Sequence, residues 1–230
     1  MLTNAEIKYL KSLREKKFRD EYGQFLVEGE KMVQEALDSR FKVVRVIRDE
    51  PDVMARISSL STPPPVIAVV EKPSPRPLAL ERGLYLGLDS VRDPGNMGTI
   101  LRLADWFGIS TVFASTDSVE FYNPKVVQSS MGSIFRVNAV YCDMAELCSR
   151  FRAMDMPVYG TFLDGVDIYT QQLAKEGLIV MGSESFGIGP EVAASVSSRL
   201  YIPSFSQGPG AESLNVATAT AIILSEFRRR

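Results

Sequence analysis

The chain of 230 residues contains no histidine, and this absence excludes a large group of mechanisms. A serine–histidine–aspartate triad and a histidine general base are both ruled out. Only two cysteines are present, Cys142 and Cys148, which are too few ligands for a zinc site. Both flank a helical pattern, so we expect buried, apolar thiols.

Long hydrophobic runs are also missing. No stretch of about 18 apolar residues occurs, so the sequence predicts no membrane-spanning helix. The N-terminus is charged, with a helical pattern, and lacks the apolar region of a signal peptide. We therefore expect a cytoplasmic protein.

Net charge is low, at −2, which is not typical of a strong nucleic-acid binder. Basic residues are nevertheless concentrated near the N-terminus. Two interpretations stay open for this cluster: a solvated helix face, or a patch that contacts RNA phosphates. Its members are Lys8, Lys11, Arg14, Lys16, Lys17 and Arg19.

Prolines divide the chain into two parts. The segment EKPSPRPL is typical of a semi-rigid linker. We predict a small α/β domain over residues 1–75, a linker over 76–81 and a second domain over 82–230. In the first domain the predicted helices are 5–14, 30–37 and 52–60, and the predicted strands are 24–28, 42–47 and 66–70.

The second part alternates short apolar strands with helices, a pattern that predicts an α/β fold whose mostly parallel sheet has helices on both faces. The predicted strands are 83–89, 111–114, 134–140, 158–162, 178–182 and 199–202. The predicted helices are 99–107, 124–131, 144–154, 168–174, 190–197 and 214–229.

Three glycine-rich loops follow predicted strands, at residues 93–98, 182–191 and 204–215. Ligands of parallel sheets bind beyond the carboxyl ends of strands, and glycine allows the backbone to approach them closely. None of the loops matches a Walker phosphate loop, a GxGxxG fingerprint or a GxSxG elbow. Together they indicate one pocket built largely from main chain.

Structural explanations exist for each polar residue of these loops taken alone. Asn96 tolerates a left-handed turn, and Arg102 is spaced to pair with Asp105 on one helix. Glu184 suits the positive end of the following helix, and Ser213 suits an N-cap. The recurrence of polar residues at three strand ends favours a site over these separate explanations.

Three ordered motifs carry a resemblance that covers nearly the whole chain. They are DSVRDPGNMGTILRLADWFG, IVMGSESFGIGPEV and YIPSFSQGPGAESLNVATATAIILSEFRR. The chain resembles the SpoU/TrmH family of RNA ribose 2′-O-methyltransferases, of the SPOUT class. The segment LKSLREKKFRDEYGQFLVEGEKMVQEAL resembles the substrate-binding domain that precedes many members.

The resemblance implies S-adenosylmethionine as methyl donor, a structured RNA as substrate, a homodimer with the active site near its interface, and a C-terminal trefoil knot. The type of N-terminal domain favours rRNA over tRNA. No metal is implied. Two other readings stay open: a non-catalytic RNA-binding module that retains the fold, and a methyltransferase for a small molecule or a protein.

The resemblance also implies residue roles. Arg102 acts as the base with help from a substrate phosphate, or only clamps that phosphate, which needs no deprotonation of arginine. Asn96 holds Arg102 or the ribose, and Glu184 orients the substrate or Arg102. Ser213 and Asn215 contact substrate or partner loops, while the adenosyl pocket is lined by Gly182, Ile202 and Leu214. The third motif departs from the family at Ser204, and QGPGAE lengthens its loop.

Overall fold

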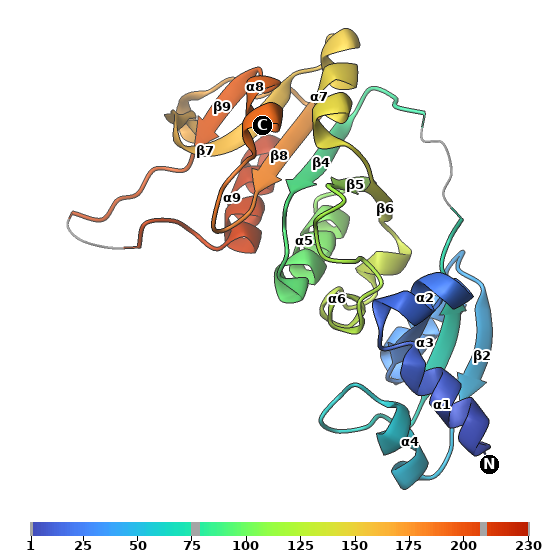
Figure 1. The fold of residues 1–230 in the computed structure, drawn as a ribbon. Helices are drawn as coiled ribbons and strands as arrows, with labels where there is room; N and C mark the ends of the chain where they lie inside the picture. Colours follow the sequence, from blue (N-terminus) through green and yellow to red (C-terminus); the bar gives the residue numbers. More distant parts are fainter. Residues whose placement is uncertain (1, 75–78, 208–210, 230) are drawn as a thin grey trace.

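The computed structural model describes residues 2–74, 79–207 and 211–229, and places two sheets one after the other along the chain (Figure 1). Residues 75–78 lie outside the described part, and they include the first half of the predicted linker, residues 76–78. The first sheet has three antiparallel strands in the order β1-β3-β2. The second has six parallel strands in the order β6-β5-β4-β8-β7-β9.

The N-terminal sheet closely follows the predicted pattern. Its strands are β1 (Gln24–Glu28), β2 (Val43–Ile47) and β3 (Ile67–Glu71), and its helices are α1 (Asn4–Ser12), α2 (Lys16–Tyr22), α3 (Glu30–Leu37) and α4 (Pro51–Ile57). Helix α2 was missed by the sequence analysis. It ends at Gly23, whose left-handed φ of 62° stops the helix immediately before β1.

The second sheet is parallel throughout, as predicted. Its strands are β4 (Leu84–Asp89), β5 (Thr111–Ala114), β6 (Asn138–Tyr141), β7 (Val158–Asp167), β8 (Gly177–Gly182) and β9 (Ser198–Tyr201). Its helices are α5 (Pro94–Trp106), α6 (Pro124–Ser129), α7 (Met144–Ala153), α8 (Pro190–Ala194) and α9 (Val216–Arg229), with 3₁₀ turns η1 (Ser133–Phe135) and η2 (Ile168–Thr170).

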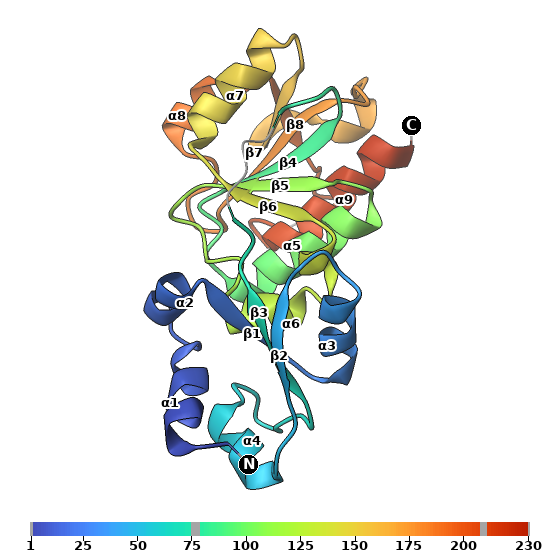
Figure 2. The ribbon, with the colours of Figure 1, turned by 90° about the vertical axis from the view of Figure 1, so that its right-hand side faces the viewer.

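Helices cover both faces of this sheet, as Figure 2 shows. Leu86 and Leu88 of β4 face the core shared with α5 and α9, whereas Tyr85 faces the core shared with α7 and α8. Successive strand residues point to opposite faces, so both faces need apolar side chains. This explains why the strands appear in the sequence as nearly continuous apolar runs.

Two predicted elements are wrong. The predicted strand 134–140 begins instead as the buried turn η1, because Gly132 takes a left-handed φ of 94° and turns the chain before β6. The predicted helix 168–174 is only the turn η2, since β7 continues to Asp167 and pairs with β9 through a register shift between Thr161 and Val166. The trefoil knot that the resemblance implies stays a prediction.

Cys148 lies within α7, and Cys142 lies two residues before this helix. Cys148 is fully buried and Cys142 is half-buried, and both are free thiols. Burial raises the pKa of Cys142 to about 11 and that of Cys148 to about 12, so neither forms a thiolate readily near neutral pH. Within the described ranges, no helix has the length and apolar content that crossing a membrane requires.

Helices α5 and α6 pack closely against each other at Gly98 of α5. A Cβ there would lie 2.0 Å from Ser129 Oγ and 2.8 Å from the Val126 carbonyl oxygen of α6. We predict that Gly98→Ala lowers the free energy of unfolding by about 1–3 kcal/mol in urea titrations, despite alanine's higher helix propensity. The control Gly83→Ala, whose Cβ would meet only Tyr85 Cε2 at 3.6 Å, should stay close to the wild type. Equal stability of the two variants would contradict this packing.

Candidate functional site

The three glycine-rich loops meet at one edge of the parallel sheet. Strands β4 and β8 are neighbours, with Asp89 opposite Gly182, so the loops that follow them start side by side. In Figure 1 the arrowheads of both strands point to the same end of the sheet, where α5 begins. Each loop therefore leaves its strand at the edge where ligands of such sheets bind.

Asn96 connects the three loops through its side-chain amide. Its Nδ2 donates to Glu184 Oε1, and its Oδ1 accepts from Asn215 Nδ2 at 2.9 Å. Asn215 in turn caps α9, because its Oδ1 accepts from the main-chain nitrogens of Ala217 and Thr218. The structure thus brings together three of the predicted site residues, from positions far apart in the sequence.

Asp89 makes a second contact between the ends of β4 and β8, and the sequence analysis did not predict it. Its buried carboxylate accepts from the Gly189 main-chain nitrogen at 2.7 Å and so joins the end of β4 to the loop after β8. The sequence feature that could have revealed this contact is an aspartate at the end of an otherwise apolar strand. Gly182 opens that loop where only glycine fits, since a Cβ would lie 2.2 Å from the Gly187 carbonyl carbon.

Asp117, in the loop after β5, holds the segment that leads from β4 into the first turn of α5, which contains Asn96 and is called the Asn96 turn below. Its carboxylate accepts from Ser90 Oγ and Ser115 Oγ at 2.7 Å, and from Arg92 at 3.1 Å. Hydrogen bonds from Ser115 and Ser90 lower the pKa of Asp117 to about 2. Ser90 has a φ of 60°, so this carboxylate stabilises a backbone conformation that serine seldom adopts.

Arg102 lies on the exposed face of α5. The alternative explanation, that Arg102 pairs with Asp105 on the same helix, is wrong. The Asp105 carboxylate accepts from Ser133 Oγ and Arg136 Nε, each at 2.8 Å, and not from Arg102. Among the described residues Arg102 forms no hydrogen bond or ion pair, and the structure does not bring it into contact with Asn96 or Glu184. Its guanidinium is therefore free to bind an external anion.

The predicted adenosyl-pocket residues lie at the end of β8, directly after β9 and just before α9. Gly182 ends β8, Ile202 is half-buried directly after β9, and Leu214 is exposed before α9. The adjoining Ser213 is exposed as well. Main-chain groups and apolar side chains suit an adenosyl group, which needs hydrogen bonds at its edge and apolar contact on its faces. Residues 208–210 of the lengthened loop lie outside the described part of the chain.

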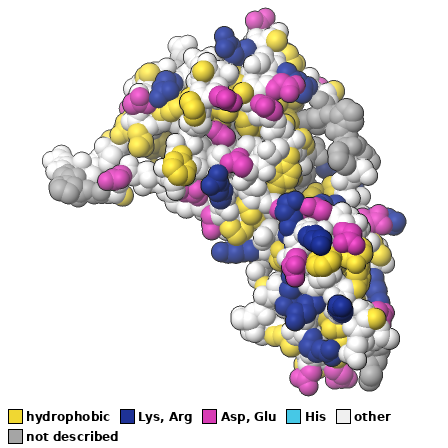
Figure 3. Space-filling model, viewed as in Figure 1, with side chains coloured by type: hydrophobic (Ala, Val, Ile, Leu, Met, Phe, Trp, Pro, Cys, Tyr) yellow, Lys and Arg dark blue, Asp and Glu magenta, His cyan; other side chains and the backbone are white. Residues whose placement is uncertain are grey.

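The structure divides the N-terminal basic cluster. Lys8, Lys11 and Lys17 are exposed, and Lys17 lies 5.7 Å from the centre of the Phe18 ring. Figure 3 shows basic side chains over this domain, interspersed with carboxylates. Lys16 is exposed as well, but it pairs with Asp20 at 2.6 Å.

Two arginines of the cluster have structural partners. Arg14 Nε donates to the Ile57 carbonyl oxygen at 2.8 Å. The prediction that Arg19 contacts RNA phosphate is wrong for the folded chain, because Arg19 is buried and paired with Glu120 of the second domain. Sequence alone could not reveal a partner so distant along the chain.

Comparisons with known proteins agree with this geometry. Residues 83–225 match the model of the SpoU rRNA Methylase family, and residues 4–72 match the MRM3-like substrate binding domain. The chain is 31% identical to the 23S rRNA (guanosine(2553)-2′-O)-methyltransferase RlmP of Bacillus subtilis, over 98% of this chain and 96% of that one.

Two solved structures superpose over the whole chain. A TrmH-family protein from Porphyromonas gingivalis is 42% identical with a TM-score of 0.90, covering 100% of this chain and 99% of its own. An AdoMet-bound rRNA methyltransferase from Sinorhizobium meliloti is 30% identical with a TM-score of 0.90, covering 100% and 96%. Both likenesses include the N-terminal domain as well as the parallel sheet.

The low pKa of Asp117 predicts an acid-dependent contribution to stability. A carboxyl whose pKa is depressed by folding stabilises the fold above its ordinary pKa, and this contribution is lost as pH falls from about 4 through about 2. The stability difference between wild type and Asp117→Asn should therefore shrink over that range. Chemical unfolding at several pH values measures it, with Asp52→Asn as the exposed control. A difference independent of pH would contradict the assignment, as would an ordinary Asp117 pKa in an NMR titration.

Proposed function

The chain belongs to the SpoU rRNA methylase family, and from this premise we propose that it transfers a methyl group from S-adenosylmethionine to a ribose 2′-hydroxyl of rRNA. The observation that carries the proposal is the amide of Asn96, which joins Glu184 and Asn215 at the edge where the three loops meet. Each of the three motifs contributes one residue to this contact.

S-adenosylmethionine supplies an already activated, electrophilic methyl group when bound. The loops after β8 and β9 and the start of α9 would hold it, through main chain around Gly182 and through Ile202 and Leu214. The tight turn in which Ser183 and Gly187 exchange main-chain hydrogen bonds of 3.0 and 2.9 Å fixes the pocket wall. Such a preformed wall orients the donor without ordering a flexible loop.

The difficult reactant is the ribose hydroxyl: its oxygen bonds to the methyl carbon as the carbon–sulfur bond of the donor breaks, and its proton passes to solvent water. Arg102 is the free cation nearest in sequence to the Asn96 turn, and we assign it to the phosphate beside that ribose. A guanidinium binds phosphate in a bidentate manner and keeps its own proton. Asn96, Glu184, Ser213 and Asn215 orient the ribose, and positioning of this kind removes several kcal/mol of the barrier.

The RNA-binding contribution of the N-terminal domain rests on Lys8, Lys11 and Lys17. These exposed lysines belong to the part of the chain that matches a substrate-binding domain. Relatives that align over the full length, such as RlmP, carry rRNA in their names, which favours rRNA over tRNA for this chain. We place the reaction in the cytoplasm, where bacterial-type ribosomes are assembled.

We also propose a homodimer that covers the exposed face of α5. Trp106 lies on this face, four residues after Arg102, and its side chain is 84% exposed. An exposed tryptophan of this kind is typical of an interface, where aromatic anchors are buried. Covering this face would place Arg102 beside a partner's loops, in accord with an active site near the interface.

Methyl transfer from tritiated donor to unmodified rRNA tests the proposed function. We predict that Arg102→Ala lowers kcat by about 100-fold or more, because the phosphate beside the reacting ribose is no longer held. Arg102→Lys should recover only part of the loss, since an ammonium cannot bind phosphate in a bidentate manner. The control Arg150→Ala, on α7 across the sheet, should retain activity.

An unlabelled rRNA, or equal rates for wild type and Arg102→Ala, would overturn the enzymatic proposal. A folded chain that binds rRNA but shows no heat of donor binding in calorimetry would support the alternative, a non-catalytic RNA-binding module. Label that survives removal of RNA by ribonuclease would point instead to a small-molecule or protein substrate.

The salt dependence of rRNA binding tests the lysine patch separately. Each lysine that contacts phosphate contributes about 0.7–0.9 to the slope of log affinity against log salt. We predict that Lys8→Gln/Lys11→Gln lowers the slope by about twice that amount, while Lys175→Gln, which precedes β8 at the opposite sheet edge, does not. An unchanged slope in the double variant would show that this helix face is merely solvated.

A further inference from the structure

The two domains are joined by a buried ion pair between Arg19 of α2 and Glu120 of the loop between β5 and α6. The side chain of Arg19 is 2% exposed and that of Glu120 is 8% exposed. Arg19 Nε lies 3.2 and 3.1 Å from the two Glu120 carboxylate oxygens, and Nη2 donates to one of them as well. We infer that Arg19 and Glu120 are positioning residues that fix the basic helix α1 relative to Asn96 and Arg102.

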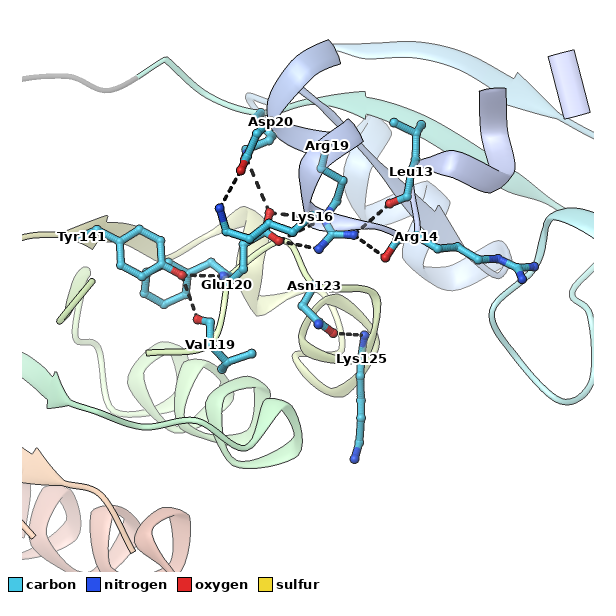
Figure 4. A network of polar contacts seen from close by, with 12 residues as sticks. Leu13, Arg14, Lys16, Arg19, Asp20, Val119, Glu120, Asn123, Lys125 and Tyr141 are labelled. Atoms are coloured by element: carbon cyan, nitrogen blue, oxygen red, sulfur yellow. Dashed lines mark hydrogen bonds and ion pairs between the residues drawn. The ribbon is translucent and has the colours of Figure 1, made fainter. Parts of the chain in front are cut away.

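Arg19 also holds the segment that follows α1. Arg19 Nη1 donates to the carbonyl oxygens of Leu13 and Arg14, at 2.9 and 2.6 Å. These carbonyls directly follow the helix that carries Lys8 and Lys11. Figure 4 shows Arg19 between these carbonyls and Glu120. One guanidinium therefore holds both the end of the basic helix and the second domain.

Glu120 is held in place through its neighbours in the chain. Its two neighbours are fixed by one hydroxyl, because Tyr141 accepts from the Phe121 nitrogen and donates to the Val119 oxygen, each at 2.8 Å. The Val119 nitrogen donates to the Val91 oxygen at 2.9 Å. Val91 belongs to the segment that leads from β4 into the Asn96 turn, so few bonds separate Glu120 from the site.

Other contacts between the domains support a fixed orientation. Phe25 and Phe41 of the first domain pack against Tyr122 and Phe135 of the second, with ring centres 4.7 Å apart for Phe25–Tyr122 and 5.2 Å for Phe41–Phe135. These apolar contacts supply attraction that is not directional. The buried guanidinium adds direction, because its donors must all meet acceptors.

The physical reason to expect a role beyond stability lies in the cost of burying charge. A buried ion pair is weak evidence for stability, since apolar residues of similar size often replace it without loss. What such a replacement removes is the fixed geometry. A fixed position of α1 relative to the catalytic loops lets both surfaces engage one RNA at a high effective concentration. This inference rests on the proposed function.

The test compares three folded proteins: wild type, Arg19→Met/Glu120→Leu, and the control Arg82→Met/Glu176→Leu. The control removes an exposed arginine–glutamate pair within the second domain. Each protein methylates transcribed large-subunit rRNA at varied concentration, and calorimetry measures donor affinity. We expect the first double variant to raise KM for rRNA by about tenfold, with kcat and donor affinity within about twofold of wild type.

A KM within about twofold of wild type would overturn the inference, as would a loss confined to kcat. Small-angle scattering gives a readout that needs no activity. An unchanged scattering profile of the double variant would also count against a positioning role of the Arg19–Glu120 pair. Wild type that labels no rRNA refutes the proposed function instead. If the double variant does not fold, Glu120→Gln keeps the shape of the contact and should raise KM in the same direction by a smaller factor.

Discussion

The side-chain amide of Asn96 is the interaction on which the site depends. A carboxamide donates through its nitrogen and accepts through its oxygen, so Asn96 can donate to Glu184 while it accepts from Asn215. An aspartate would repel Glu184, and an apolar side chain would leave both partners without this contact. The same Asn215 side chain caps α9 through its oxygen. Orientation of the final helix is thereby coupled to the loops that follow β4 and β8.

This amide can bridge the loops only because the sheet brings their origins together. Asp89 lies opposite Gly182 in a parallel pair, and its carboxylate reaches beyond that pair to the Gly189 nitrogen. A side chain at Gly182 would meet the backbone of Gly187 and Ile188, so the loop folds back tightly onto the end of β8. The site is thus a consequence of register: a one-residue shift would move Asp89 to the other face and separate the loops.

The sequence predicted the parts of this arrangement that follow from local pattern. Apolar strands, helix starts and the common edge of parallel strands were enough to bring the three loops together, and with them Asn96 and Glu184. Asn215 was singled out only by the resemblance to the SpoU/TrmH family. Contacts set by distant packing were not predictable in this way. Arg19 appears in the sequence as one of several basic residues, and only the docked loop around Glu120 shows that it is buried. Helix propensity likewise failed at 168–174, where pairing with β9 decides the conformation.

Burial of Arg19 also bears on how a chain with a net charge of −2 could recognise RNA. Several basic residues near the N-terminus hold the protein's own carbonyls and carboxylates, which leaves Lys8, Lys11 and Lys17 exposed there. With few phosphate contacts, the electrostatic part of the affinity is small. An enzyme of low charge must therefore obtain more of its RNA affinity from contacts at defined positions. Such contacts form together only if the binding surfaces keep a fixed separation. The Arg19–Glu120 pair and the aromatic contacts between the domains meet that requirement. If the domains moved freely, the entropy lost in ordering them on binding would offset the affinity that the few charges contribute.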